Sequence, residues 1–299
     1  MNDLGVCLGC TTPGTCTPAC AQWDLDGDAT VTLADFALYT GCPNLPLICP
    51  GGSIDHYKVY NLDPEVAPIP GVLLADQFGT GLVNLTNLGK LGLPVSKAHA
   101  PNPPSGVLLR PDEHLSWYEF FEPKALQLVR VKNQFESEAK GAIWTISDAQ
   151  FLLVPAIKDG GVANGGIRLE QHWKCYNAAP FFNPSVTVNL LDQFHLEANV
   201  IVGSGRYLCN PVEKNSEGPP SFPEGHLACY GIPQDPFGGV HVLDDQFGNH
   251  PGLVVENPEM LCLPSIKYLP EPGALLSFGS GLMLLGWLDR RRRQRAIGR

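Results

Sequence analysis

The sequence is short of positive charge. It has 20 lysines and arginines against 30 aspartates and glutamates, a formal net charge of −10. Six of the arginines follow residue 289, so without them residues 1–289 carry a formal charge of −16. Nucleic-acid binding needs a basic surface that neutralises phosphates, and these residues offer no such cluster. The sequence therefore predicts a protein with no nucleic-acid partner.

Motifs of common catalytic centres are also missing. The chain has no Gly-x-Ser-x-Gly elbow, no His-Glu-x-x-His pair and no phosphate-binding glycine loop. A catalytic centre needs side chains in unequal roles, whereas the histidines and lysines of this chain recur at equivalent places. We therefore predict a protein that is not an enzyme and has no catalytic residue, with a secreted hydrolase as the alternative.

Glycine and proline are abundant, and both disfavour long helices. The 32 glycines and 28 prolines make about a fifth of the chain, while 44% of the residues are apolar. This composition predicts an all-β protein of short strands and turns, with enough apolar surface for a core.

Four copies of one sequence unit follow one another between residues 54 and 269. Each copy has a His-x-x-x-Tyr segment, an Asp/Asn-Gln-Phe segment and a Leu-x-x-Pro-x-x-Lys segment. The copies, called repeats one to four below, contain His56, Tyr60, Asp76, Pro94 and Lys97; His114, Tyr118, Asn133, Pro155 and Lys158; His172, Tyr176, Asp192, Pro211 and Lys214; and His226, Tyr230, Asp245, Pro264 and Lys267. This period predicts an array of one supersecondary unit.

Each repeat is expected to form three or four antiparallel strands. In the His-x-x-x-Tyr strand the residues one and three after the histidine are apolar or half-cystines, so this face is predicted to be core. The Asp or Asn should cap a turn before a returning strand, and the Phe should fill the core. Proline in the last segment suits a strand edge or end. We predict tandem antiparallel β-repeats in sandwich- or barrel-like lobes, with repeats one and two at 54–166 and three and four at 167–269.

Cysteine usage within the repeats predicts two disulfide bonds. Repeats three and four each have two cysteines, at Cys175 and Cys209 and at Cys229 and Cys262, whereas repeats one and two have none. Cysteines that occur together and are absent together indicate bonds within a repeat, Cys175 to Cys209 and Cys229 to Cys262. The three segments also resemble a bacterial repeat domain of unknown function, which implies a β-repeat fold and no known activity.

Residues 1–50 form a different, cysteine-rich segment. Six cysteines lie within 43 residues, at Cys7, Cys10, Cys16, Cys20, Cys42 and Cys49. A segment this small cannot bury a large core, so disulfides are expected to stabilise it. A zinc site is the alternative, although the cysteine pairs are closer together than in common zinc modules.

A calcium-binding loop is predicted inside this segment. Oxygen ligands stand at positions 1, 3, 5, 7 and 12 of a twelve-residue loop, as hard Ca²⁺ ions prefer; they are Asp24, Asp26, Asp28, Thr30 and Asp35. The loop resembles that of dockerin repeats, but Ala29 replaces the usual glycine and there is one copy where dockerins have two. We expect weak calcium binding, with a solvated acidic turn as the alternative.

The C-terminal residues 270–299 combine a Pro-Glu-Pro motif, an uncharged stretch and an arginine cluster. Pro270, Glu271 and Pro272 precede sixteen uncharged residues, and four consecutive arginines follow, from Arg290 through Arg291 and Arg292 to Arg293. A sixteen-residue helix would extend about 24 Å, short of the roughly 30 Å hydrocarbon layer. These three features in this order resemble a PEP-CTERM sorting signal, which implies processing by an exosortase-type enzyme and at least transient contact of this helix with the membrane. A plain tail anchor is the alternative.

Together these features predict an exported bacterial protein of the cell surface or extracellular matrix. Ten cysteines suit an oxidising compartment. Residues 1–4 show no basic segment followed by an apolar run, so no secretory signal is visible. We expect that the start codon has been placed too late or that the gene is truncated. A cytoplasmic protein is the alternative. The leading hypothesis is a structural or adhesive repeat protein. A module that binds extracellular polysaccharide or another surface protein, its tyrosines and tryptophans stacking on sugars, is the second.

Overall fold

The computed structural model describes the repeat region. The described residues are 54–63, 66–104, 108, 110–135, 141–160, 171–181, 183–233 and 237–268. The calcium-loop residues Asp24 to Asp35, the six N-terminal cysteines and the C-terminal motif from Pro270 to Arg293 lie outside them. Within the described ranges, no helix is long and apolar enough to cross a membrane.

The described part is all-β, as predicted, and its strands are antiparallel. The strands are β1 His56–Asp63, β2 Ile69–Asp76, β3 Gly79–Leu85, β4 Asn87–His99, β5 His114–Glu122, β6 Gln127–Lys132, β7 Ala142–Lys158, β8 His172–Pro180, β9 Thr187–Leu191, β10 Leu196–Ile201, β11 Gly205–Lys214, β12 His226–Gly231, β13 Gly239–Asp245 and β14 Gly248–Tyr268. In repeats two and four the returning strand continues without a break into the proline-containing strand, which makes β7 and β14 long.

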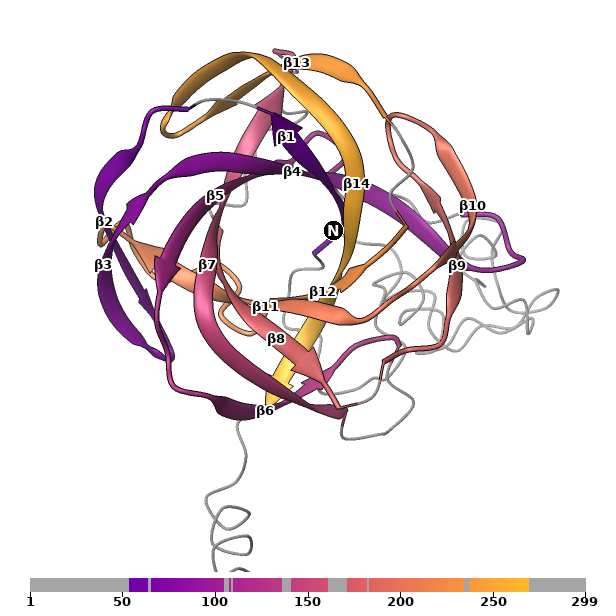
Figure 1. The fold of residues 1–299 in the computed structure, drawn as a ribbon, viewed down its shortest axis with the longest axis horizontal. Helices are drawn as coiled ribbons and strands as arrows, with labels where there is room; N and C mark the ends of the chain where they lie inside the picture. The colour runs from indigo at the N-terminus through magenta and orange to yellow at the C-terminus, as the bar shows by residue number, and fades with distance from the viewer. Residues whose placement is uncertain are drawn as a thin grey trace, which may run out of the picture.

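Two strands from each repeat build a closed inner ring. Neighbouring strands pair in the order β1, β4, β5, β7, β8, β11, β12, β14 and back to β1. Figure 1 looks down this ring. The pairing of β14 with β1 joins repeat four to repeat one, so the repeats share one barrel. The sequence suggested two lobes, because linear offsets do not show that the first and last repeats meet.

A hairpin from each repeat covers the barrel from outside. Its leading strand pairs with the proline-containing strand of the repeat two positions away: β2 with β11, β6 with β14, β9 with β4 and β13 with β7. In Figure 1 the hairpins lie at four sides of the ring, at β2 and β3, β6, β9 and β10, and β13. The proline-containing strand of each repeat is therefore paired with the hairpin of the repeat opposite.

The repeated proline lies where its strand changes neighbour. Pro94, for example, follows the β4 residues that pair with β5, which end at Gly92, and precedes those that pair with β9, which begin at Ser96. Proline has no N–H to donate to a ladder, so this gap tolerates it. The other three repeats place their proline at the same transition.

Both faces of the inner strands are buried. The face predicted to be core lines the barrel interior, with Tyr57, Val59, Leu115, Trp117, Trp173, Cys175, Leu227 and Cys229 all at most 1% exposed. The opposite face packs under the outer hairpins, where Tyr60, Tyr118, Tyr176 and Tyr230 are at most 1% exposed. The tyrosines therefore offer no outward surface for sugar rings.

Two disulfides join paired residues of neighbouring strands on the face that lines the barrel interior. The structure joins Cys175 to Cys209 and Cys229 to Cys262, which are the two bonds predicted from the sequence. Repeats one and two fill the corresponding space by packing. A Cβ on Gly92 would lie 3.1 Å from Trp117 Nε1, so the small residue of repeat one makes room for the indole of repeat two.

Candidate functional site

The Asp/Asn-Gln-Phe segments form four equivalent turns, which we call the DQF turns. In each, the first residue accepts a hydrogen bond through its Oδ1 from the backbone N–H of the phenylalanine, at 2.8 to 3.0 Å. This side-chain contact closes a turn at the tip of the outer hairpin. Asparagine also has an Oδ1 acceptor, which is why Asn133 can stand where the other repeats have aspartate.

The remaining oxygen or nitrogen of that residue contacts a tyrosine across the ring. Tyr60 donates to Asp192, Tyr118 to Asp245 and Tyr176 to Asp76, at 2.6, 2.8 and 2.7 Å, while Asn133 Nδ2 donates to the Tyr230 hydroxyl at 2.8 Å. Each contact joins repeats two positions apart, and the partner phenylalanine packs edge-on against the same tyrosine. Burial, followed by the charge and hydrogen bond of the aspartate, raises the pKa of Tyr60, Tyr118 and Tyr176.

The glutamine and phenylalanine of each DQF turn contact the preceding repeat. Gln77 meets His226, Gln134 meets His56, Gln193 meets His114 and Gln246 meets His172. The lysine that ends each repeat lies over the phenylalanine of the next, with Nζ 4.2 to 5.6 Å from the ring centre. Both series close from repeat four back to repeat one.

The repeated histidines are held neutral. Burial is the main cause that lowers their pKa, to about 3 for His56 and His226 and about 4 for His114 and His172, and the nearby lysine of the same repeat lowers it further. His226 Nδ1 lies 2.9 Å from the Glu224 carbonyl, which can only accept, so this nitrogen carries the proton. Gln77 then donates to Nε2. Each of these histidines therefore connects its repeat to the next one through the glutamine contact.

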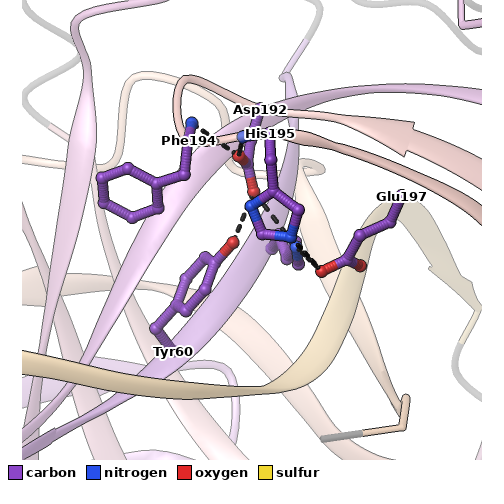
Figure 2. A network of polar contacts seen from close by, with 6 residues as sticks. Tyr60, Asp192, Phe194, His195 and Glu197 are labelled. Atoms are coloured by element: carbon purple, nitrogen blue, oxygen red, sulfur yellow. Dashed lines mark hydrogen bonds and ion pairs between the residues drawn. The ribbon is translucent and has the colours of Figure 1, made fainter. Parts of the chain in front are cut away.

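The network between repeats one and three contains additional charges. Lys58 Nζ, fully buried, lies 2.6 Å from Glu197 Oε1 and 3.3 Å from Asp192 Oδ2. His195 Nε2 contacts the same Glu197 oxygen at 2.6 Å. Figure 2 shows Asp192, His195 and Glu197 close together, with the Tyr60 hydroxyl directed at Asp192. Two carboxylates thus face one ammonium ion and one partly exposed imidazole.

The equivalent lysine of repeat three obtains its carboxylate from a different place. Lys174 is also fully buried and bonds to Glu122, which lies at the end of β5. In repeat one the position equivalent to Glu197 is Gly81, and a Cβ there would lie 3.2 Å from Glu122 Oε1. The Glu122 carboxylate therefore occupies the space that a side chain at position 81 would fill. Burial tends to raise its pKa, but bonds to Lys124 and Lys174 lower it overall.

Repeats two and four lack that lysine and have Ser116 and Ala228 instead. Near Ser116 the position equivalent to Glu197 holds His250, whose Nε2 lies 2.9 Å from the Tyr118 hydroxyl. His250 also lines a groove of about 570 Å³ between repeats one and four, beside Asp63, Ile69 and Phe247. Its lining is polar and apolar in about equal parts.

The network shows what the conspicuous side chains of the sequence do. The repeated His, Asp and Lys are brought together, but as contacts between different repeats. In the described ranges no group of three or more His, Cys, Asp or Glu side chains could hold a metal ion. Sequence reasoning missed Lys58, Lys174, Glu122 and Glu197. The presence of lysine two residues after the histidine in repeats one and three alone was the available signal.

One family model matches the chain. It is described as a repeat of unknown function (DUF7450) and matches residues 114–264, from the histidine of repeat two to the proline of repeat four. No curated protein and no solved structure matches the chain. Repeat one lies outside the matched residues, although it makes the same contacts as the others. The match spans half of the chain, which therefore belongs to this family of repeats of unknown function (DUF7450).

Proposed function

We propose that this chain is an exported, non-catalytic structural or adhesive protein of a bacterial surface or extracellular matrix. The observation that carries the proposal is the use of the repeated polar side chains. In each DQF turn the Asp or Asn, the Gln and the Phe contact two other repeats. Such contacts, together with two disulfides inside the barrel, suit a body that must stay folded outside the cell.

The attachment in this proposal rests on the sequence of residues 270–299. Its resemblance to a PEP-CTERM signal supports delivery by an exosortase-type enzyme, with the apolar stretch in the membrane at least transiently. The dockerin-like loop supports weak Ca²⁺ binding by Asp24, Asp26, Asp28, Thr30 and Asp35. Calcium titrations of the full chain and of its Asp24→Ala variant, followed by spectroscopy, test that site. Equal spectra of the two proteins at millimolar calcium would refute calcium binding there.

A binding role for the body is the second candidate. Large apolar side chains are exposed on the outer hairpins or directly before them, among them Leu82 at 70%, Leu126 at 70% and Val240 at 69%. Exposed apolar residues on several hairpins favour a protein partner over a sugar, because the tyrosines and tryptophans of the described ranges, which could stack on sugar rings, are largely buried. The groove beside His250 is a further candidate surface.

The proposal is tested with a variant that keeps the hydrogen bonds of one DQF turn but removes the carboxylate that a chemical role would need. Asp245→Asn reproduces the asparagine that repeat two has naturally, so it keeps the turn and the tyrosine contact but removes the carboxylate. In a producing bacterium from which the gene is deleted, this variant should restore surface attachment and matrix cohesion as well as the original chain does.

Two controls make that experiment decisive. A chain that ends at residue 269 should fold and appear in the medium, because it lacks the sorting tail. If Asp245→Asn melts like the original chain and reaches the surface but restores nothing, the carboxylate has a chemical role and the structural proposal fails.

A further inference from the structure

Asn210 is a buried polar side chain at a position where the other repeats are apolar. It lies on β11 between Cys209 and Pro211 and is 0% exposed. Repeats one, two and four have Leu93, Val154 and Leu263 there. A buried carboxamide costs roughly 1–3 kcal/mol without hydrogen-bond partners, so its contacts must account for it.

The Asn210 carboxamide lies between an amine and a carboxylate. Its Oδ1 accepts from Lys267 Nζ at 3.1 Å, and its Nδ2 donates to Asp76 Oδ2 at 3.3 Å. Asp76 is fixed by the Tyr176 hydroxyl at 2.7 Å and the Phe78 N–H at 3.0 Å. The three groups come from repeats three, four and one, so only closure of the ring assembles them.

Lys267 differs from the equivalent lysines of repeats two and three. Lys158 pairs with Asp159, and Lys214 pairs with Glu217. Lys267 is buried to a similar degree as Lys214, at 6% exposed, but among the described residues no carboxylate lies within 4.0 Å of its Nζ, which is 4.2 Å from the centre of the Phe78 ring. Burial lowers its pKa to about 7, although the charge of Asp76 acts in the opposite direction. An uncharged amine, the nucleophilic form of lysine, is therefore well populated at neutral pH.

We propose that Lys267 and Asn210 form an amide cross-link without any external enzyme, with Asp76 as the proton relay. Nζ attacks the side-chain carbonyl carbon of Asn210, and a new C–N bond forms. Once Nζ is bonded to that carbon, it is on the same carbon as Nδ2, which Asp76 contacts at 3.3 Å; Asp76 then accepts a proton from the former Nζ and delivers one to Nδ2. The old C–N bond then breaks and one ammonia molecule leaves. One bond forms, one breaks, and no oxidant, reductant or cofactor is consumed.

The cross-link would join β11 to β14 and thereby repeat three to repeat four. Unlike the disulfides it would survive reduction. It is confined to this joint, because Leu93, Val154 and Leu263 have no carboxamide to react. Asn210 is 0% exposed and Lys267 is 6% exposed, and this burial limits the access of competing water to the carbonyl carbon.

Peptide mapping of the full chain tests the bond. After reduction, alkylation and trypsin digestion, we expect peptide 207–214 joined to the peptide that contains Lys267, with a mass lower by one ammonia. Trypsin should not cut after the blocked Lys267. Separate, unmodified peptides 207–214 and 215–267 from the folded, oxidised chain would overturn the proposal.

Three variants test the roles of the residues. Asn210→Leu, which copies repeats one and four, and Lys267→Arg should both fold without the bond. Asp76→Asn, which copies Asn133, keeps the DQF turn but cannot relay protons. During refolding from the unfolded chain at pH 8 it should form the bond about 100-fold more slowly or not at all.

The pH dependence supplies an independent readout. Because the pKa of Lys267 is about 7, the rate of bond formation in the original chain should fall about tenfold for each pH unit below that value. Formation of the bond by Asp76→Asn at the original rate would refute the relay, and a rate independent of pH between 5 and 7 would refute attack by this amine.

Discussion

Removal of the Glu122 carboxylate should destabilise the protein, and a carboxylate at position 81 should restore much of the loss. Glu122→Ala leaves Lys174 buried with its main anionic partner gone. Breaking a buried ion pair from one side costs about 3–5 kcal/mol. The Glu122 side chain is 17% exposed, so we expect the lower end, about 3 kcal/mol of unfolding free energy.

The rescue follows from the equivalence of the repeats. Gly81 occupies the position that holds Glu197 in repeat three, and its Cβ direction leads to the place of the Glu122 carboxylate. With Glu122→Ala present, Gly81→Glu should reach Lys174 as Glu197 reaches Lys58. In the original chain Gly81→Glu should destabilise, because two carboxylates would compete for one space.

Urea unfolding of the original chain, the two single variants and the double variant forms a double-mutant cycle. We expect the double variant to recover at least half of the loss caused by Glu122→Ala, which gives a coupling of more than about 1.5 kcal/mol. Losses that simply add, or a Glu122→Ala variant as stable as the original, would refute the assignment of Glu122 as the counterpart of Glu197.

Two further perturbations have a predicted sign. The pKa of His226 is about 3 in the folded protein and near 6.5 when unfolded, so the unfolded chain binds the proton first and stability falls as pH drops below 6.5. At pH 5.5 this difference in pKa should lower the unfolding free energy by about 1.4 kcal/mol. The His226→Gln variant should therefore lose less unfolding free energy than the original chain between pH 7 and pH 5.5. Equal losses in the two proteins would contradict this. Replacing Cys175 by Val and Cys209 by Gly, as in repeat one, removes a bond that spans 34 residues. We expect a loss of about 3–4 kcal/mol in non-reducing urea titrations, and a loss below 1 kcal/mol would contradict it.

The sequence predicts the local parts of this fold well. Alternation in the His-x-x-x-Tyr segments identifies the barrel interior, where Val59, Trp117 and Cys175 are indeed fully buried. The joint presence and absence of cysteines identifies both disulfides. These features depend on contacts within one strand or one repeat, which the spacing of residues along the chain records.

The contacts between repeats could not be predicted in this way. Tyr60 and Asp192 are 132 residues apart, and the sequence of neither repeat indicates that the two side chains are in contact. The repeated tyrosines therefore remained candidates for stacking on sugars, whereas the structure buries them under the hairpin of the repeat opposite. Gly81 and Glu122 illustrate the same difficulty, because one repeat supplies the charge that another lacks.

The central claim is that four repeats close into one ring through reciprocal contacts. Native-state hydrogen exchange in low denaturant tests it most directly, because it measures the opening free energy of each strand. We predict that amides of β1, β5, β8 and β12 converge on one global unfolding free energy. A separate, lower free energy for the strands of repeats one and two, with those of repeats three and four still protected, would contradict the closed ring.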